Sequence, residues 1–455
     1  MNPLHVVILA AGQGSRMKSD LPKVLHSVAG RPMLHHVIGT ARKLGADKIH
    51  TVIGHGGDKV RATTNESLVN WVVQDEQLGT GHAVAQALPY LPDDARVLIL
   101  YGDVPLTRTE TLQAMVKSLD DNTLGLLTVT LDNPQGYGRI VRDANDQVTS
   151  IVEQKDASKD QLAIREVNTG ILAIAARHLK SWLPTLSNAN AQGEYYLTDI
   201  IAMAVERNLK ISVSQPEDPF EVQGVNNRLQ LAELERWVQK REAERLMTDG
   251  ATLADPARID VRGELVIGKD ILIDVNVVFE GKVSLGNNVS VGPGCVIRDT
   301  VIADGVQINA HSVIDGAVIG VNAQIGPFAR IRPGTELAAN TKVGNFVETK
   351  KALVGEGSKI NHLSYVGDAS LGRNVNVGAG TITCNYDGVN KFQTVIGDGV
   401  FVGSNTSLVA PVCIGAGVTI GAGSTITRNV DDNELAVARG QQRNIKGWKR
   451  PQKSD

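Results

Sequence analysis

Residues 265–301, LVIGKDILIDVNVVFEGKVSLGNNVSVGPGCVIRDTV, carry an apolar residue at every sixth position, and this repeat decides the fold of the C-terminal part of the chain. The same register runs to residue 343 and is apolar except at Gln307. Its positions are Leu265, Ile271, Val277, Val283, Val289, Cys295, Val301, Gln307, Val313, Ile319, Ile325, Ile331, Leu337 and Val343. Neither a helix (period about 3.6) nor an ordinary strand (period about 2) repeats in this way. A six-residue repeat predicts the flat sides of a prism-shaped parallel β-helix, with one aliphatic side chain per side facing inward.

The repeat is interrupted twice before it ends. Two lysines follow Thr349 on the register, the repeat resumes at Leu371 and Val377, and residues 383–392 interrupt it again. A third stretch holds Ile396, Val402, Leu408, Ile414, Ile420 and Ile426. With ~18 residues per three-sided coil, residues 251–437 predict roughly ten coils. The basic residues beyond them belong either to a solvated terminus or to a segment that closes over an anionic ligand.

The length of the chain predicts more than one domain. A chain of 455 residues exceeds an ordinary single core, so we expect two or three domains. The net charge of −3 gives no reason to expect nucleic acid, and no apolar run approaches the ~18 residues that span a bilayer. The N-terminus has no basic segment before its first apolar run, which therefore predicts a strand rather than a signal peptide. Three scattered cysteines predict a reducing compartment, the cytoplasm, rather than disulfides or a zinc site.

Residues 1–226 predict an α/β domain with a Rossmann-like mixed sheet. Strand-like runs at 5–11, 48–53, 71–74 and 96–101 alternate with helix-like runs at 32–44, 80–88 and 109–119. Residues 227–250 contain many helix formers, with Leu231, Leu234, Trp237 and Val238 on one side, and predict a long linker helix. The chain therefore divides into an N-terminal domain, this linker, and a β-helix domain with a tail at residues 251–455.

A glycine turn follows the first predicted strand. Gly12 and Gly14 would let backbone N–H groups approach phosphate oxygens without a Cβ atom in the way. The glycines alone are equally compatible with a tight turn that binds nothing, because the third glycine of a dinucleotide fingerprint and the lysine of a P-loop are both absent. Arg16 and Lys23 favour a ligand, since two cations this close to the turn can neutralise a triphosphate and its departing pyrophosphate.

The pattern LAAGQGSRM at residues 9–17, followed by Pro22-Lys23, resembles the signature of sugar-nucleotide pyrophosphorylases. Further matches lie at residues 74–81, 101–103, 136–139, 153, 168–170 and 224–227. The resemblance implies that nucleotide and sugar are bound by Leu9, Ala10, Ala11, Gly12, Gly14, Arg16, Lys23, Gln74, Gly79, Thr80, Tyr101, Gly102, Asp103, Gly138, Glu153, Asn168 and Asn226.

Asp103 follows the predicted strand at residues 96–101, at a carboxyl end, where ligands of open α/β sheets gather. It is either a turn or helix-capping carboxylate, or a ligand of Mg²⁺ that Asn226 completes. Mg²⁺ binds few protein oxygens besides phosphates and waters, so an Asp–Asn pair suffices. Within the series of motifs we favour the metal and expect Mg²⁺ at Asp103 and Asn226.

Polar residues cluster around the two interruptions of the repeat, where a β-helix does not need them. Loops that leave the coil are where solenoid proteins bind ligands. A single histidine is more often structural, but Arg332 and Lys350 could hold a sugar phosphate beside His362, whose imidazole can take a proton near neutral pH. Cys384 could be a nucleophile, although we expect a small loop thiol.

The fusion of a hexapeptide β-helix to a pyrophosphorylase domain resembles the bifunctional bacterial N-acetylglucosamine-1-phosphate uridyltransferase / glucosamine-1-phosphate acetyltransferase family, over residues 9–439. The resemblance implies a left-handed parallel β-helix, a homotrimer, and acetyl-CoA and UTP as co-substrates. It implies His362 as the general base. The amino-sugar phosphate would be bound by Arg332, Lys350, Tyr365 and Asn376. The acetyl-CoA path would be lined by Ala379, Asn385, Tyr386, Ser404, Ala422 and Arg439.

The activity implied by this resemblance is the making of UDP-N-acetylglucosamine in two transfers. Acetyl moves from acetyl-CoA to glucosamine 1-phosphate, and uridylyl then moves from UTP to N-acetylglucosamine 1-phosphate with release of pyrophosphate. Three alternatives remain open: a pyrophosphorylase with a regulatory β-helix, a non-enzymatic assembly factor built on the same folds, and a purely structural solenoid. The first would share the motifs and the repeat but should lack the group formed by Arg332, Lys350 and His362.

Overall fold

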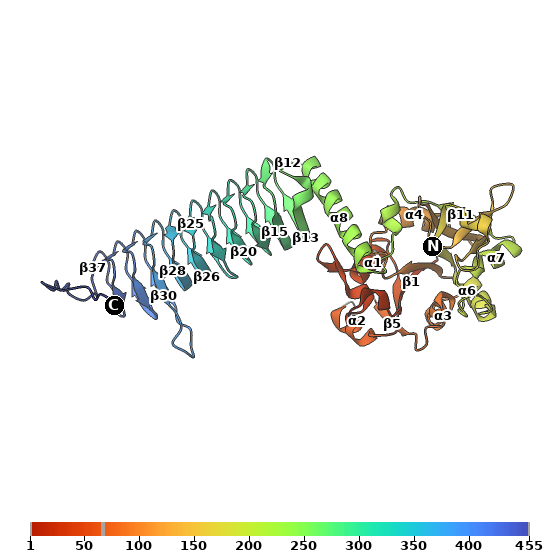
Figure 1. Ribbon diagram of the computed structural model, residues 1–455, viewed down its shortest axis with the longest axis horizontal. Coiled ribbons are helices and arrows are strands. Elements are labelled where there is room, and N and C mark those ends of the chain that lie inside the picture. The colour runs from red at the N-terminus through yellow and green to blue at the C-terminus, as the bar shows by residue number, and fades with distance from the viewer. Residues whose placement is uncertain (1, 65–68, 454–455) are drawn as a thin grey trace. The chain divides into compact units, whose positions relative to one another are not determined.

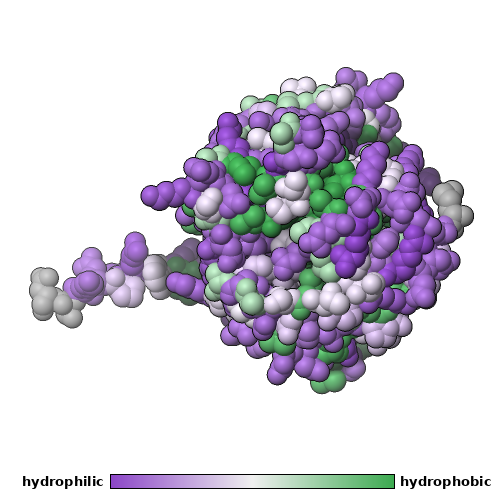
Figure 2. Space-filling view, turned by 90° about the vertical axis from the view of Figure 1, so that its right-hand side faces the viewer, coloured by the Kyte–Doolittle hydropathy of each residue, from purple (hydrophilic) through white to green (hydrophobic). Residues whose placement is uncertain are grey.

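The computed structural model describes residues 2–64 and 69–453 (Figure 1). The chain forms two compact units, one ending at Val238 and the other beginning at Gln239. Hydrophilic side chains cover most of the face shown in Figure 2, with hydrophobic ones gathered in smaller areas between them. None of the helices in the described part of the chain is long and apolar enough to span a bilayer.

The N-terminal unit is built on a mixed sheet. Its strands are β1 (Leu4–Ala10), β4 (Lys48–Ile53), β5 (Val69–Val73), β6 (Arg96–Tyr101), β7 (Thr123–Thr130), β8 (Arg139–Arg142), β9 (Val148–Val152), β10 (Glu166–Ala175) and β11 (Lys210–Ser214). They follow the order β11-β7-β10-β6-β1-β4-β5, with β8 and β9 attached at β10. The pairs among β1, β4, β5 and β6 are parallel, whereas β10 runs antiparallel to β6 and β7. The predicted mixed α/β sheet is confirmed. A separate hairpin joins β2 (Ser27–Val28) to β3 (Arg31–Pro32).

Two hydrophobic cores lie against this sheet. The helices of the unit are α1 (Met33–Lys43), α2 (Gly57–Thr63), α3 (Thr80–Ala85), α4 (Thr109–Lys117), α5 (Lys159–Leu162), α6 (Ala176–Trp182) and α7 (Asp199–Glu206). Its short 3₁₀ turns are η1 (Ser15–Met17), η2 (Lys23–Leu25), η3 (Leu88–Tyr90), η4 (Leu183–Thr185) and η5 (Pro219–Val222). In β1, Val7 and Leu9 pack with α3, α6 and α7, while Val6 and Ile8 pack with α1, α2 and α4. Burial on both faces explains why this central strand is a continuous apolar run.

The C-terminal unit is a parallel β-helix. One sheet stacks eleven strands, β12 (Ala251–Leu253), β14 (Ile271–Ile273), β16 (Ser290–Val291), β19 (Gln307–Ile308), β22 (Gln324–Ile325), β25 (Lys342–Asn345), β27 (Lys359–His362), β29 (Asn376–Val377), β32 (Phe401–Val402), β35 (Thr419–Ile420) and β37 (Leu435–Ala436). The other sheet has fifteen, β13 (Ile259–Ile267), β15 (Val277–Leu285), β17 (Val296–Arg298), β18 (Val301–Ile302), β20 (Val313–Asp315), β21 (Val318–Ile319), β23 (Arg330–Ile331), β24 (Glu336–Leu337), β26 (Glu348–Val354), β28 (Tyr365–Leu371), β30 (Ile382–Cys384), β31 (Thr394–Ile396), β33 (Ser407–Val409), β34 (Val412–Ile414) and β36 (Thr425–Ile426). A short turn, η6 (Pro256–Arg258), precedes β13.

The single six-residue register predicted for residues 265–343 is wrong at Val301, Gln307 and Val313. Val301 and Gln307 are exposed and Val313 is only half-buried. The buried residues are instead the next ones along the chain, Ile302, Ile308 and Ile314.

This change of register has a geometric cause. Each side of a coil has two inward positions, two residues apart, as at Val289 and Val291. The step between inward residues is five rather than six from Ile297 to Ile302, and the same shortening recurs before Ile319. Each short side moves the register by one residue. The residues of the predicted six-residue series therefore lie at the first inward position at the start of the series. They then lie at an outward position, and finally at the second inward position. Gln307 faces outward, which accounts for its polarity.

A long helix, α8 (Arg228–Thr248), lies within residues 227–250, where the sequence predicts one. Its C-terminal part packs on the first coil of the β-helix unit. The Gln239 amide nitrogen donates to the Val261 carbonyl at 2.9 Å, and the Val261 backbone N–H donates to the Gln239 Oε1 at 2.7 Å. Ala243 and Leu246 then enter the hydrophobic core of the β-helix.

Candidate functional site

A cavity of about 220 Å³ opens where β1 and β6 end in the N-terminal unit. Ten of the predicted nucleotide- and sugar-binding residues line it: Leu9, Ala10, Ala11, Gly12, Lys23, Gln74, Gly79, Thr80, Tyr101 and Asp103. Because the carboxyl ends of neighbouring parallel strands meet at one edge of a sheet, the segments after β1, β5 and β6 converge there. The other seven predicted residues do not line the cavity: Gly14, Arg16, Gly102, Gly138, Glu153, Asn168 and Asn226.

Some lining residues were not predicted: Val24, Gln77, Ala83 and Glu194. Gln77 lies inside a recognised motif, but Glu194 comes from a distant loop. The sequence signal for that loop was Gly79, whose φ is 113°. A Cβ atom at Gly79 would lie 2.7 Å from the Tyr195 carbonyl oxygen, so this glycine admits the backbone of the loop that carries Glu194. A glycine can indicate a close approach without indicating which segment approaches.

The glycine turn after β1 packs against Lys23. Gly14 has a φ of 65°, and a Cβ atom there would lie 2.7 Å from the Cβ atom of Lys23. Both the left-handed conformation and the lack of space favour glycine. The turn thus brings the Lys23 side chain to the cavity.

Lys23 is the centre of a cluster of charges and side-chain oxygens. Its Nζ forms an ion pair with Asp103 Oδ2 and lies 3.4 Å from Asn226 Oδ1. The Arg16 guanidinium donates to the same Asn226 oxygen at 2.9 Å. The side chains of Lys23 and Asp103 are only 15% and 16% exposed. Two oxygens from distant parts of the chain therefore converge on one cation.

A second acidic group lies close to Tyr101. Burial raises the pKa of the Glu153 carboxyl, which accepts a hydrogen bond from the Thr198 hydroxyl at 3.1 Å. Burial, and then the charges of Glu153 and Asp103, raise the pKa of the Tyr101 phenol. The phenol therefore stays protonated at neutral pH and can donate a hydrogen bond. Gly170 leaves room for its ring, because a Cβ atom at Gly170 would lie 2.5 Å from it.

In the β-helix unit, β25 and β27 stack so that Asn345 pairs with His362. The Nδ1 atom of His362 lies 3.0 Å from Asn345 Oδ1. An amide oxygen only accepts hydrogen bonds, so this contact places the proton on Nδ1 and leaves Nε2 able to take another. The histidine is exposed.

Cations gather beside this coil. Lys391 first, and then Arg332, lower the pKa of the Lys350 ammonium, so three positive charges lie close together. Arg332 donates to Glu348 Oε1 at 2.6 Å. Lys391 was not predicted, because it lies in the second interruption of the repeat, where periodicity gives no position. Tyr365 pairs with Glu348 on the neighbouring strand.

Asn376 pairs with Lys359, on the strand that carries His362. Of the predicted amino-sugar phosphate residues, Lys350 and Arg332 thus lie close enough for their positive charges to interact, while Tyr365 and Asn376 lie on the stacked strands.

The predicted acetyl-CoA residues divide into a column and a loop. In the column, the Asn405 backbone N–H donates to the Ala379 carbonyl at 2.7 Å, and the Arg439 guanidinium donates to the Ala422 carbonyl at 2.7 Å. Ser404 lies between these coils, since its carbonyl accepts from the Gly423 N–H at 2.8 Å.

The loop holds the other two predicted residues, Asn385 and Tyr386. The Asn385 amide donates to Asp368 Oδ2 at 2.5 Å and is buried, whereas Tyr386 is exposed. The loop is closed by a bridge between Tyr386 and Lys391.

Within residues 2–64 and 69–453, no group of three or more His, Cys, Asp or Glu side chains could hold a metal ion. The three cysteines, Cys295, Cys384 and Cys413, are free. The metal position predicted from the sequence, at Asp103 and Asn226, has one carboxylate and one amide oxygen.

The cavity at the end of an α/β sheet and the histidine-bearing coils of a hexapeptide β-helix define a nucleotidyltransferase joined to a hexapeptide-repeat transferase. Matches to known sequence families support the same class for each part of the chain. Residues 6–193 match the family described as MobA-like NTP transferase domain, and residues 393–428 match bacterial transferase hexapeptide (six repeats). Residues 261–340 match the GMPPB C-terminal domain.

Full-length relatives identify the particular family. The chain is 76% identical over 454 residues to Bifunctional protein GlmU of Marinobacter nauticus, with 100% of both chains covered. It is 60% identical over 451 residues to that of Pseudomonas putida and 61% over 450 residues to that of Pseudomonas entomophila, covering 99% of each chain. A solved nucleotidyl transferase from Methanothermobacter thermautotroptrophicus is 19% identical, with a TM-score of 0.38, covering 52% of this chain and 97% of that one.

The chain belongs to the GlmU family. It is a bifunctional acetyltransferase and uridyltransferase that makes UDP-N-acetylglucosamine. The alternatives of a regulatory β-helix, an assembly factor and a structural solenoid are thereby set aside.

Proposed function

We propose that separate parts of the chain carry out the two transfers, uridylyl transfer by residues 1–226 and acetyl transfer by residues 251–455, with residues 227–250 as the linker. The observation that carries this proposal is the separation of two clusters of reactive side chains. Lys23 and Asp103 lie at the cavity of one unit, whereas His362 and Lys350 lie on coils of the other. Neither reaction requires a covalent enzyme intermediate.

In the first reaction, the amine of glucosamine 1-phosphate attacks the thioester carbonyl of acetyl-CoA. Nε2 of His362 takes a proton from the amine as the C–N bond forms, the C–S bond breaks, and the proton passes on to the departing thiolate. Asn345 keeps the ring in the required tautomer. General-base help of this kind contributes ~10²–10⁴ in rate.

Each co-substrate of this reaction has its own set of side chains. The amino-sugar phosphate is bound by Arg332, Lys350, Tyr365 and Asn376. Acetyl-CoA follows Ala379, Asn385, Tyr386, Ser404, Ala422 and Arg439.

In the second reaction, a phosphate oxygen of N-acetylglucosamine 1-phosphate attacks the α-phosphorus of UTP, and the bond to the bridging oxygen of pyrophosphate breaks. Arg16 and Lys23 neutralise the negative charge that gathers on the phosphates. Asp103 and Asn226 would hold Mg²⁺, which when bound would supply a divalent positive charge to the phosphate oxygens.

The residues present fit this metal. Asp103 Oδ2 and Asn226 Oδ1 already share one cation, the Lys23 ammonium. Two protein oxygens are the small number that Mg²⁺ uses when phosphates and waters complete its shell.

The functional unit is a homotrimer in this proposal. A ridge of three stacked rings, His311, Phe328 and Phe346, continued by Leu363 on the next coil, runs along one edge of the β-helix. The ring centroid of Phe328 lies 5.2 Å from that of His311 and 5.5 Å from that of Phe346. Both phenylalanines are about half exposed. Exposed contiguous apolar patches mark protein interfaces. Because Leu363 follows His362, a second copy packed on the ridge would reach the acetyl-transfer residues. We infer that these contacts close into a ring of three copies.

The three free cysteines support a cytoplasmic location, where thiols stay reduced.

Two variants of the full chain test which part of the chain carries out each transfer. His362→Ala should lower acetyl transfer ~10²–10⁴-fold and leave uridylyl transfer intact, whereas Asp103→Ala should abolish Mg²⁺-dependent UTP turnover and leave acetyl transfer intact. Equal loss of both activities in His362→Ala, or full UTP turnover in Asp103→Ala, contradicts the assignment. Light scattering that returns the mass of a single chain contradicts the trimer.

A further inference from the structure

Lys23 occupies the position between the two oxygens assigned above to Mg²⁺. Its ammonium forms an ion pair with Asp103 Oδ2 and lies 3.4 Å from Asn226 Oδ1. A metal ion bound by the same two oxygens would come within a few ångströms of this ammonium, where like charges repel strongly. The lysine and the metal therefore compete for one site.

The surroundings hold Lys23 in this position. The Gly14 backbone packs against its Cβ atom, and its side chain is 15% exposed. Asp103 is nearly as sheltered, so leaving its carboxylate without a cation would be costly. Asn226 also accepts from Arg16, which keeps its oxygen turned toward positive charge. Asp103 therefore retains Lys23 until another cation arrives to replace it.

We propose that Lys23 excludes free Mg²⁺ from the empty site, and that the metal enters only together with the triphosphate. Phosphate oxygens offer the ammonium an alternative set of charged acceptors. When the nucleotide binds, Lys23 moves to a phosphate and releases both protein oxygens to the metal. The substrate of this site is then the metal–triphosphate complex, not free metal followed by nucleotide. The inference rests on the metal site of the proposed function.

The test is a direct binding measurement with Mn²⁺ as the probe, in which the electron paramagnetic resonance signal of free Mn²⁺ is followed as full-length protein is added without nucleotide. The wild-type chain should bind Mn²⁺ weakly. Lys23→Met should bind it at least tenfold more tightly, because Asp103 then has no internal cation. Lys23→Arg should bind as weakly as the wild type, since a cation is restored. Lys59→Met is the matched control, because Lys59 donates to the Asp20 backbone carbonyl rather than to Asp103 or Asn226 within the described residues, and it should behave as the wild type.

Two outcomes separate this inference from the proposed function. Equal Mn²⁺ affinity of the wild type and Lys23→Met, with unchanged near-ultraviolet circular dichroism, overturns the exclusion by Lys23. The Lys23→Met, Asp103→Ala double variant reports on the metal site itself. If it retains the tight Mn²⁺ binding of Lys23→Met, the metal is bound elsewhere and the proposed ligands are wrong.

Discussion

The Nδ1 atom of His362 lies 3.0 Å from Oδ1 of Asn345, its partner on the preceding coil. This contact fixes both the tautomer and the orientation of the ring. Asn345→Ala should therefore lower the rate constant of acetyl transfer about tenfold, less than the loss of the base itself. The measurement is a thiol-release assay at saturating substrates. Gln307→Ala, at an outward position on the same sheet, is the control, and a wild-type rate in Asn345→Ala would show that the contact is not used.

Lys391 adds a third positive charge beside Lys350 and Arg332. We expect Lys391→Gln to raise the KM for glucosamine 1-phosphate about tenfold, the effect of one charge-assisted hydrogen bond, and to change the KM for acetyl-CoA little. Initial-rate kinetics with each substrate varied in turn distinguish the two constants. Lys342→Gln, an exposed lysine of β25, should change neither. An unchanged KM for the sugar phosphate in Lys391→Gln would remove Lys391 from the binding site.

A buried histidine pair makes the N-terminal unit sensitive to acid. His5 Nδ1 lies 2.9 Å from His50 Nε2, and burial lowers the pKa of both, that of His50 to about 4. The unfolded chain takes up these protons near the ordinary value of 6.5, so stability is complete above that pH and falls as the pH drops toward 4.

The loss should be on the order of 2 kcal/mol by pH 4. Urea unfolding followed by the fluorescence of Trp71 and Trp182 at several pH values measures it. His50→Gln should flatten the dependence between pH 6.5 and 4. An equally steep loss in that variant would assign the acid sensitivity to other groups.

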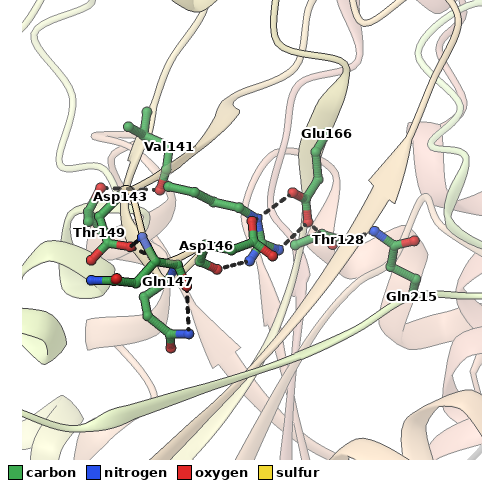
Figure 3. Close-up of polar contacts among 10 residues, drawn as sticks. Thr128, Val141, Asp143, Asp146, Gln147, Thr149, Glu166 and Gln215 are labelled. Atoms are coloured by element: carbon green, nitrogen blue, oxygen red, sulfur yellow. Dashed lines mark hydrogen bonds and ion pairs between the residues drawn. The ribbon is translucent and has the colours of Figure 1, made fainter.

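Glu166 accepts a hydrogen bond from the Thr128 hydroxyl at 2.7 Å, and that hydroxyl in turn accepts one from the Gln215 amide (Figure 3). It accepts two hydrogen bonds of 2.8 Å from the Arg142 guanidinium, which lowers the pKa of its carboxyl. Glu166→Gln should reduce the free energy of unfolding by about 1–3 kcal/mol at pH 7.

Because the pKa of Glu166 is lowered in the folded state, its contribution is complete above the ordinary value of 4.5 and is lost as the pH falls further. Denaturant titrations at pH 7 and pH 3.5 should show the difference between the variant and the wild type shrinking. Glu206→Gln, an exposed residue, is the control. A constant difference at both pH values would contradict the role of the charge.

The sequence predicted much of the nucleotide cavity because its residues follow strand ends. Asp103 and the glycine turn lie directly after buried strands, and parallel strands bring such segments together without further information. Glu194 and Lys391 could not be predicted in this way, since both come from segments without periodicity. The β-helix was predicted from its repeat, but not the five-residue side before Ile302, because an apolar residue also occupies the outward position at Val301.

The Gln239 side chain pairs with the Val261 backbone as a neighbouring strand would, with one donor and one acceptor. An unpaired strand edge at the first coil would offer the same groups to any other chain. Solenoids need such terminal caps to remain soluble. A single amide in the middle of α8 thus helps to determine that stacking stops here, so that the protein remains a discrete particle instead of growing end to end into fibres.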